Sequence, residues 1–190
     1  MRTLTLPLLA AMAAFALPAR ADDAQWLAEA RQTASALPPK LITRLMEEIS
    51  RSGMDGAIAV CRDMAPQMAR EVTAQTGWSV RRVSLKTRNE QRATPDAWER
   101  AALEEFDRRA AAGEDPARIE KGETVVEAGR HVYRYMKALP VQPLCLNCHG
   151  PADQWAPGVG AKLAEAYPHD HAVGYSVGQL RGAVSVRKGQ

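Results

Sequence analysis

Beyond its first 21 residues the chain has no apolar run long enough to cross a bilayer, which excludes internal membrane spans. It has no internal repeat and no low-complexity tract, which excludes a repeat array. It also carries almost no net charge in that part: without Arg2 and Arg20, 23 basic residues stand against 22 acidic ones. This balance gives no reason to expect nucleic-acid binding. The roughly 170 residues that remain suit one domain with its own core.

Cysteine is scarce, and the spacing of the few cysteines limits the kinds of metal site that they can form. The sequence has three cysteines and 4 histidines, with no second C-x-x-C pair and no H-x₃-H pair. The usual four-ligand zinc site therefore lacks half of its ligands. Two cysteines, Cys145 and Cys148, are close in sequence, which leaves Cys61 without an obvious partner.

The first 21 residues predict a cleaved signal peptide. Arg2 precedes an apolar run from Leu4 to Leu17, which is too short to span a bilayer, and Ala19-Arg20-Ala21 supplies an A-x-A cleavage signal. We therefore expect two parts, a signal peptide at 1–21 and a mature domain at 22–190. The mature product should be exported and soluble, which in a bacterium places it in the periplasm.

The most specific motif is Cys145-Leu146-Asn147-Cys148-His149, which reads C-x-x-C-H. This is the attachment sequence for c-type haem, one per chain: two thiols each add to a vinyl group, and the following histidine reaches the iron from the proximal side. Pro143 before the motif and Gly150-Pro151 after it favour a loop over a regular element.

Three other uses of the motif are weaker. A redox dithiol needs a helix that starts at the first cysteine, which the flanking prolines oppose. Zinc lacks two further ligands. A disulfide between Cys145 and Cys148 would close a small, strained ring. An exported protein also suits covalent haem, so we expect haem c.

Hydrophobic periodicity predicts an α+β fold. The expected helices are 22–37, stopped by Pro38-Pro39; 40–51, ended by Ser52-Gly53; 55–77, kinked at Pro66; 95–113, with Thr94 as N-cap and Pro95 as first residue; and 159–167. The expected strands are 78–86, 121–127, 131–138 and 181–187, with a hairpin turn at Gly129 and a polar loop at 87–93. Few of these strands could be parallel neighbours, so we expect an antiparallel sheet with the N-terminal helices packed on one face.

The second axial ligand is open on residue chemistry alone. Cys61 is the first candidate, because it lies on the apolar face of its helix with no disulfide partner left. Its alternative role is that of a small buried hydrophobe. The other candidates are Met54, Met64, Met68, Met136, His131, His169 and His171. Packing explains the methionines and solvent-exposed loops explain the histidines equally well.

Haem propionates are carboxylates, so arginines should hold them. The candidates on or beside predicted strands are Arg81, Arg82, Arg88 and Arg181. Each could equally be a solvated surface residue. Tyr133 and Tyr135 share one strand face, which lines either the porphyrin or the core.

Several blocks together resemble one known family. They are Gly56–Cys61 with Ala65-Pro66, Val83–Lys86 with Arg88-Asn89 and Trp98-Glu99, Leu144–Gly150, and Gly174-Tyr175 with Val177-Gly178, Arg181-Gly182 and Ser185-Val186. They are similar to the exported, PAS-like c-type haem domain family, typified by a cyanobacterial cytochrome whose iron is bound by His and Cys. The similarity covers nearly all of the mature chain. Glu90-Gln91-Arg92-Ala93 departs from the family, which usually has Pro and a second Asn there.

The resemblance implies a PAS-like α+β fold and, by motif position, His149 and Cys61 as axial ligands. We then expect a monohaem c-type cytochrome that senses redox state or a small molecule such as a diatomic gas. Its partner would be an unidentified periplasmic redox or signalling protein, because the chain carries no kinase and no anchor after processing. A plain electron carrier is the alternative. A peroxidase-like enzyme is a third class, which a Cys61 ligand argues against; we expect no enzymatic activity.

Overall fold

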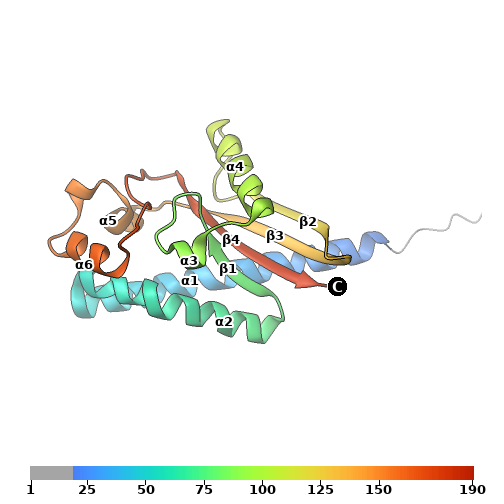
Figure 1. Ribbon diagram of the computed structural model, residues 1–190, viewed down its shortest axis with the longest axis horizontal. Helices are drawn as coiled ribbons and strands as arrows, with labels where there is room; N and C mark the ends of the chain where they lie inside the picture. The colour runs from blue at the N-terminus through green and yellow to red at the C-terminus, as the bar shows by residue number, and fades with distance from the viewer. Residues whose placement is uncertain (1–18) are drawn as a thin grey trace, which may run out of the picture.

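The computed structural model describes residues 19–190. Four antiparallel strands form one sheet, and helices lie on both of its faces (Figure 1). The N-terminal helical part is α1 (Ala19–Ala59), a π-helical turn η1 (Val60–Met64) and α2 (Ala65–Thr76). The remaining elements are β1 (Ser79–Val83), α3 (Glu90–Ala93), α4 (Ala97–Ala111), β2 (Glu120–Glu127), β3 (Arg130–Pro140), η2 (Pro143–Cys145), α5 (Leu146–His149), η3 (Ala152–Gln154), α6 (Val159–Ala166) and β4 (Leu180–Gly189).

The sheet has the order β1-β4-β3-β2, with every pair antiparallel. Strands β2 and β3 form the predicted hairpin, whose turn residues Ala128 and Gly129 both have positive φ angles, 49° and 74°. This geometry matches the right-handed twist of a tight hairpin and explains the glycine. The predicted α+β class and antiparallel sheet are confirmed.

Alternation along the strands separates two apolar cores. On one face Val80, Tyr135 and Val184 pack with residues of α1 and α2. On the other face Met136 and Ala183 pack with Phe106 of α4 and its neighbours. The N-terminal helices therefore cover one face as expected, while α4 covers the opposite face, which the prediction had left open (Figure 1).

The predicted stop at Pro38-Pro39 is wrong. Helix α1 continues through both prolines, and the first non-helical residue is Gly53, with φ 78°. Leu37 is buried before the prolines, and Leu41 and Leu45 line a cavity after them. Packing on both sides of the prolines outweighs the backbone hydrogen bonds that they remove. The predicted helix end at Ser52-Gly53 is confirmed.

Pro66 changes the helical backbone one turn before its own position. It has no N–H to donate to the carbonyl of Arg62, and the backbone widens over Val60–Met64 so that Ala65 N donates to Val60 O. Pro66 itself lies in the first turn of α2, where it costs no hydrogen bond. The predicted kink is thus a π turn, and Cys61 lies inside it.

Two local predictions in the middle of the chain are wrong. Asp96, not Thr94, caps α4: its side chain accepts from Glu99 N, and the Glu99 carboxylate accepts from Asp96 N, each at 2.9 Å. The expected polar loop contains α3, formed by the residues that depart from the family pattern and capped by Asn89. The capping residues are Asn89 for α3 and Asp96 for α4, and helix propensity alone identifies neither of them.

None of the helices in residues 19–190 is long and apolar enough to cross a membrane. Nearly all of the predicted signal peptide, residues 1–18, lies outside the described part of the chain.

Glu99 is almost completely buried, with 1% exposure, between Arg81 and Arg134, each 3.7 Å away. We expect Glu99→Ala to lower the free energy of unfolding by about 2 kcal/mol, because Arg134 loses one of its buried carboxylate partners and α4 loses the Glu99 half of its capping box. Urea unfolding measures this. The exposed Glu104→Ala on the same helix should change it by less than about 0.5 kcal/mol; equal effects of the two would contradict the role of Glu99.

Candidate functional site

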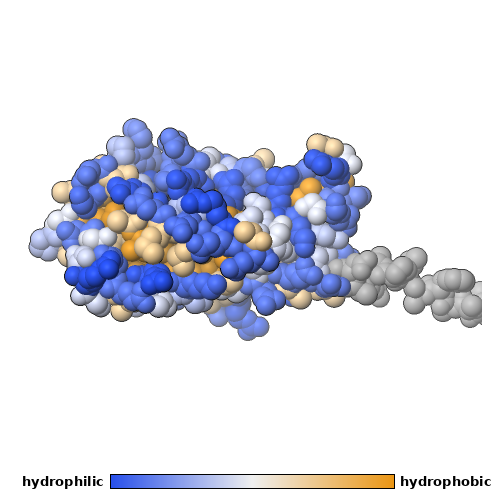
Figure 2. All heavy atoms as spheres, turned by 90° about the horizontal axis from the view of Figure 1, so that it is seen from below, coloured by the Kyte–Doolittle hydropathy of each residue, from blue (hydrophilic) through white to orange (hydrophobic). Residues whose placement is uncertain are grey.

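One cavity gathers the residues that the sequence singled out. Cys61 lines it from the helical side, and Cys145, Cys148 and His149 line it from the loop between β3 and β4. Most of the remaining wall is apolar, and α1 contributes the largest share of it: Leu37, Pro38, Leu41, Ile42, Leu45, Ile49, Met54, Ala57 and Ile58. Seen from below, hydrophobic residues gather in the half of the molecule away from the N-terminus, with hydrophilic residues around them (Figure 2).

The C-x-x-C-H motif is not the loop that its prolines predict. It forms two consecutive short turns, η2 followed by α5, and Pro143 occupies the first position of η2. Proline is compatible with that position because its N–H would be unpaired there anyway. The side chain of Asn147 closes the turn by donating to Leu144 O at 3.0 Å. The motif is therefore a compact helical turn. Its two cysteines are free thiols, and so is Cys61.

His149 is held in one tautomer. Its Nδ1 lies 2.8 Å from the carbonyl oxygen of Ala172. A carbonyl only accepts, so Nδ1 carries the proton and Nε2 keeps its lone pair. Burial first, and then the charges of Arg181, Arg88 and Arg82, hold the pKa of His149 far below its usual range. The ring is thus neutral, as a metal ligand must be.

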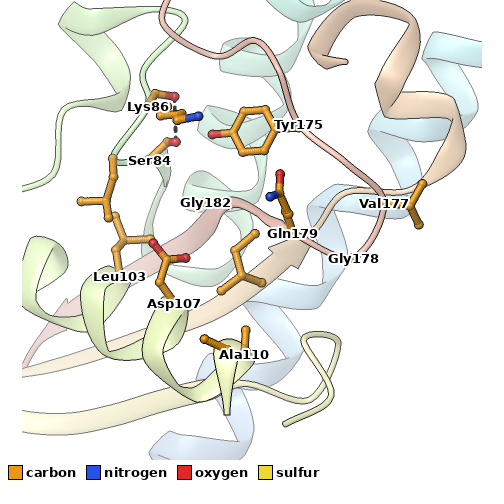
Figure 3. A pocket seen from close by; sticks show the side chains of 13 residues that line it. Ser84, Lys86, Leu103, Asp107, Ala110, Tyr175, Val177, Gly178, Gln179 and Gly182 are labelled. Atoms are coloured by element: carbon orange, nitrogen blue, oxygen red, sulfur yellow. Dashed lines mark hydrogen bonds between the residues drawn. The ribbon is translucent and has the colours of Figure 1, made fainter. Parts of the chain in front are cut away.

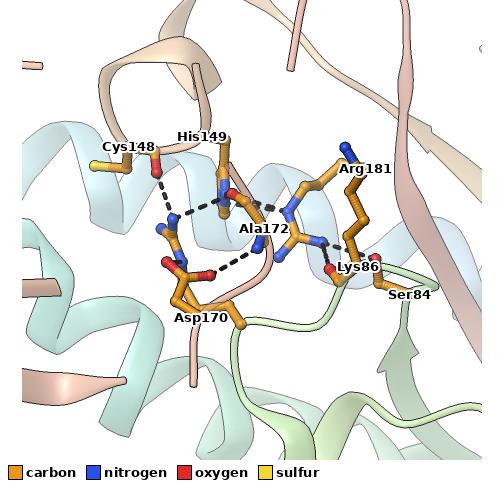
Figure 4. A network of polar contacts seen from close by, with 8 residues as sticks. Ser84, Lys86, Cys148, His149, Asp170, Ala172 and Arg181 are labelled. Carbon is orange, nitrogen blue, oxygen red and sulfur yellow. Dashed lines mark hydrogen bonds and ion pairs between the residues drawn. The ribbon is translucent and has the colours of Figure 1, made fainter. Parts of the chain in front are cut away.

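Arg88 fastens the motif to the loop that carries Ala172. Its Nε donates to Asp170 Oδ2 at 2.9 Å, and its Nη2 donates to the carbonyls of Cys148 and Ala172; Figure 4 labels these three partners. Asp170 in turn accepts from Ala172 N at 2.8 Å. The ion pair is about nine-tenths buried on both sides. The loop expected to be solvent-exposed, residues 168–171, is therefore anchored through Asp170.

Arg181 reaches the cavity because β4 contains a bulge. Leu139 pairs with Gly182 and Pro140 pairs with Leu180, so Arg181 has no partner on β3. Regular alternation from Ala183 would place Arg181 on the α4 face, but the bulge turns it into the cavity. There its Nη1 donates to Ser84 Oγ at 2.9 Å, and its Nε lies 3.3 and 3.4 Å from the two ring nitrogens of His149.

Positive charge gathers in this cavity. Arg82, Arg88 and Arg181 line it, and no carboxylate is among the lining residues. Arg82 points to the α1 side of the sheet, since its register partner is Val184. Burial lowers the pKa of Arg82 and brings that of Arg181 to about 9. Arg81, the fourth predicted anion-binding arginine, faces the other way and contacts Glu99 on α4.

Cys61 is exposed by surface area because its side chain opens into the cavity. Burial among protein atoms raises the pKa of its thiol, and the charges of Arg82, Arg88 and Arg181 act against that increase. Negative charge on this sulfur would therefore meet three cations. The position within a π turn agrees with the frequent use of such turns at functional sites.

Of the other candidates for a second ligand, only Met54 lines the cavity. Met136 is fully buried in the α4 core, Met68 packs on the α1 core, and Met64 is 39% exposed. The remaining candidates, His131, His169 and His171, are exposed and do not line the cavity. Tyr133 and Tyr135 belong to the core with Trp26 and Trp78.

Sequence reasoning missed the residues that support the site. Asp170 and Ser84 hold Arg88 and Arg181 across 82 and 97 positions of chain, and no local spacing links such pairs. The zinc alternative finds no support in residues 19–190, where no group of three or more His, Cys, Asp or Glu lies close enough to hold a metal ion.

Comparison with known proteins shows the family and the fold of the chain. The model of the Tll0287-like family matches residues 17–188. The chain belongs to the Tll0287-like family. A solved structure, described as the cyanobacterial heme-protein Tll0287, is 30% identical, with a TM-score of 0.62, over 92% of this chain and 98% of that one. No curated protein sequence matches the chain.

Gly182 makes the bulge possible. Its φ is 133°, and a Cβ there would lie 2.2 Å from the carbonyl oxygen of Val83. We expect Gly182→Ala to lower the free energy of unfolding by about 2 kcal/mol, from backbone strain and the clash. Thermal or urea unfolding tests this against Gly189→Ala in the same strand, where no atom lies within 4 Å. Equal stability of the two variants would show that the close approach is not required.

Proposed function

We propose that the chain is a periplasmic monohaem c-type cytochrome that senses redox state or a small molecule. Cys145 and Cys148 attach the porphyrin, and His149 and Cys61 bind the iron. The observation that carries the proposal is that one apolar cavity is lined by all four of these residues. The heme-protein described for the family relative supports the same cofactor.

The residues that line the cavity have the chemistry that haem c requires. An apolar wall suits the porphyrin, and two thiols three positions apart suit its two vinyl groups. Arg82, Arg88 and Arg181 bring three positive charges, and Asp170 balances one of them through Arg88. The two charges left over equal the two propionates of one haem.

Each residue around the site has a separate task. Ala172 O keeps the proton on Nδ1 of His149, so that Nε2 is the ligand atom. Arg88 fixes the turn that carries Cys148 and His149. Arg181 contacts the same imidazole, and its guanidinium would hold a propionate when haem is bound. The apolar residues of α1 exclude water, which strengthens these charge interactions.

When bound, haem c would supply one-electron redox chemistry and, if Cys61 or His149 left the iron, a position for a small ligand. Cys61 lies in the π turn between two helices, so a shift of that turn can move its sulfur without disturbing the sheet. This favours sensing. A simple electron carrier would instead keep both ligands in both redox states. A peroxidase-like enzyme would need an open iron position in the resting state.

A redox titration read by electron paramagnetic resonance, with optical spectra under CO and NO, separates these functions. Sensing predicts a low-spin thiolate signal in the ferric state and rapid gas binding on reduction, with loss of the thiolate band. Indifference to both gases with a reversible potential would favour electron transfer. Turnover of peroxide would favour an enzyme. Absence of covalently added porphyrin mass in protein from its own host would end the proposal.

Replacing the sulfur tests the second ligand directly. We expect Cys61→Ser to remove the thiolate features from the ferric spectrum, because serine is a poor ligand for haem iron. The haem content, measured as the pyridine haemochrome, should stay the same. Met54→Leu is the matched control, since Met54 lines the same cavity. If only the Met54 variant changes the spectrum, Met54 is the ligand and Cys61 is not.

Adjacent arginines on opposite faces test the cavity charge. We expect Arg82→Gln to lower the midpoint potential by about 30 to 60 mV, equivalent to about 1 kcal/mol, because a nearby cation favours the reduced iron. Arg81→Gln should leave the potential unchanged, since Arg81 faces α4. Potentiometry with optical detection measures both. Equal shifts would contradict the placement of Arg82 beside the cofactor.

A further inference from the structure

A second groove, of about 640 Å³, lies next to the site and shares no lining residue with the cavity (Figure 3). It is bounded by α4, by the segment Ser84–Lys86 after β1, and by the segment before β4. Leu85, Leu103 and Leu180 give it an apolar floor. The groove is therefore separate from the cavity of the proposed haem site.

Three polar side chains point into the groove (Figure 3). The Lys86 ammonium lies 5.1 Å from the ring centre of Tyr175, and Asp107 projects from α4. Gln179, which also lines the groove, accepts from Ser176 N at 2.9 Å through Oε1, so its amide N–H₂ remains available as a donor. Neither Lys86 nor Asp107 forms an ion pair within residues 19–190, although both face the same space.

The two charges influence each other without touching. Burial raises the pKa of Asp107, and the charge of Lys86 acts against that increase. An anion bound at Lys86 would face the Asp107 carboxylate, and a cation bound at Asp107 would face the ammonium. Only a molecule that carries both charges satisfies both groups.

We propose that this groove binds a small zwitterion of the amino-acid class. The ligand ammonium would contact Asp107, its carboxylate would contact Lys86 and the Gln179 amide, and its side chain would cover the leucine floor. The size of the groove admits a free amino acid or a dipeptide, which present the same pair of charged ends.

Residues that line the groove contact residues of the proposed haem site. Tyr175 packs edge-on to His149, with 6.3 Å between ring centres and an 88° angle, and Tyr175 N donates to His149 O at 2.9 Å. Arg181 donates to Lys86 O at 3.2 Å. A ligand that contacts Tyr175 and Lys86 therefore acts on the proximal histidine. This coupling, unlike the binding itself, rests on the proposed haem function.

Calorimetric titration of the mature, haem-loaded protein tests the binding. The probe is L-leucine, followed by the other standard amino acids. We expect a dissociation constant below about 1 mM for at least one of them. N-acetyl-leucine, which lacks the cation, and leucinamide, which lacks the anion, should each bind at least about tenfold more weakly than leucine if leucine is a ligand. No binding by any amino acid up to about 10 mM, or equal binding of the blocked forms, overturns the proposal.

Variants locate the binding in the groove. Lys86→Met and Asp107→Asn should each weaken binding at least about tenfold, and Ala111→Trp should block it by filling the space. Glu104→Gln, an exposed carboxylate of α4 outside the groove, should bind as the wild type does. Undiminished binding in all three groove variants would overturn the site, even if one of them folded poorly.

The coupling has its own readout. We expect the bound amino acid to shift the g values of the ferric protein in the wild type but not in Asp107→Asn. Calorimetric binding without any shift would overturn the coupling and leave the site intact. Failure of the haem proposal is seen separately, as a missing pyridine haemochrome in a protein that still binds the amino acid.

Discussion

The hydrogen bonds of Arg88 hold the site together. They join the carbonyl of Cys148, in the C-x-x-C-H turn, to Asp170 and Ala172, in a loop that follows it by about twenty residues. Because Ala172 O also accepts from His149, one side chain fixes both the turn and the orientation of the imidazole within it. Loss of this arginine would remove the side-chain link between the two segments and leave only backbone hydrogen bonds, such as Tyr175 N to His149 O, and the His149 contact to join them.

Irregular backbone places the other functional groups. The bulge at Arg181 and the π turn at Cys61 each insert a residue into an otherwise regular element, and each turns one side chain into the cavity. The elements themselves remain supported by two apolar cores on opposite faces of the sheet. The regular strands and helices thus make the site rigid, and the bulge and the π turn orient the side chains of Arg181 and Cys61.

The sequence was most informative where a pattern is local. The antiparallel sheet, the hairpin at Gly129 and the turn residue Gly53 follow from alternation and from glycine chemistry. Motif spacing alone singled out Cys145, Cys148 and His149. The continuous helix through Pro38-Pro39 depends on packing against a distant cavity wall, so propensity failed there. The partners of Arg88 and Arg181 lie far away in the chain, so the spacing of residues in the sequence does not predict them.

The three arginines around the cavity have a consequence for how the protein matures. Like charges confined by an apolar wall repel one another, and within residues 19–190 Arg88 is the one of the three that forms an ion pair with a carboxylate. A dianionic occupant relieves that repulsion, so occupancy and folding stability are thermodynamically linked. A chain without such an occupant is then the more readily unfolded form, and a protease that cuts unfolded chains distinguishes the two forms by stability alone.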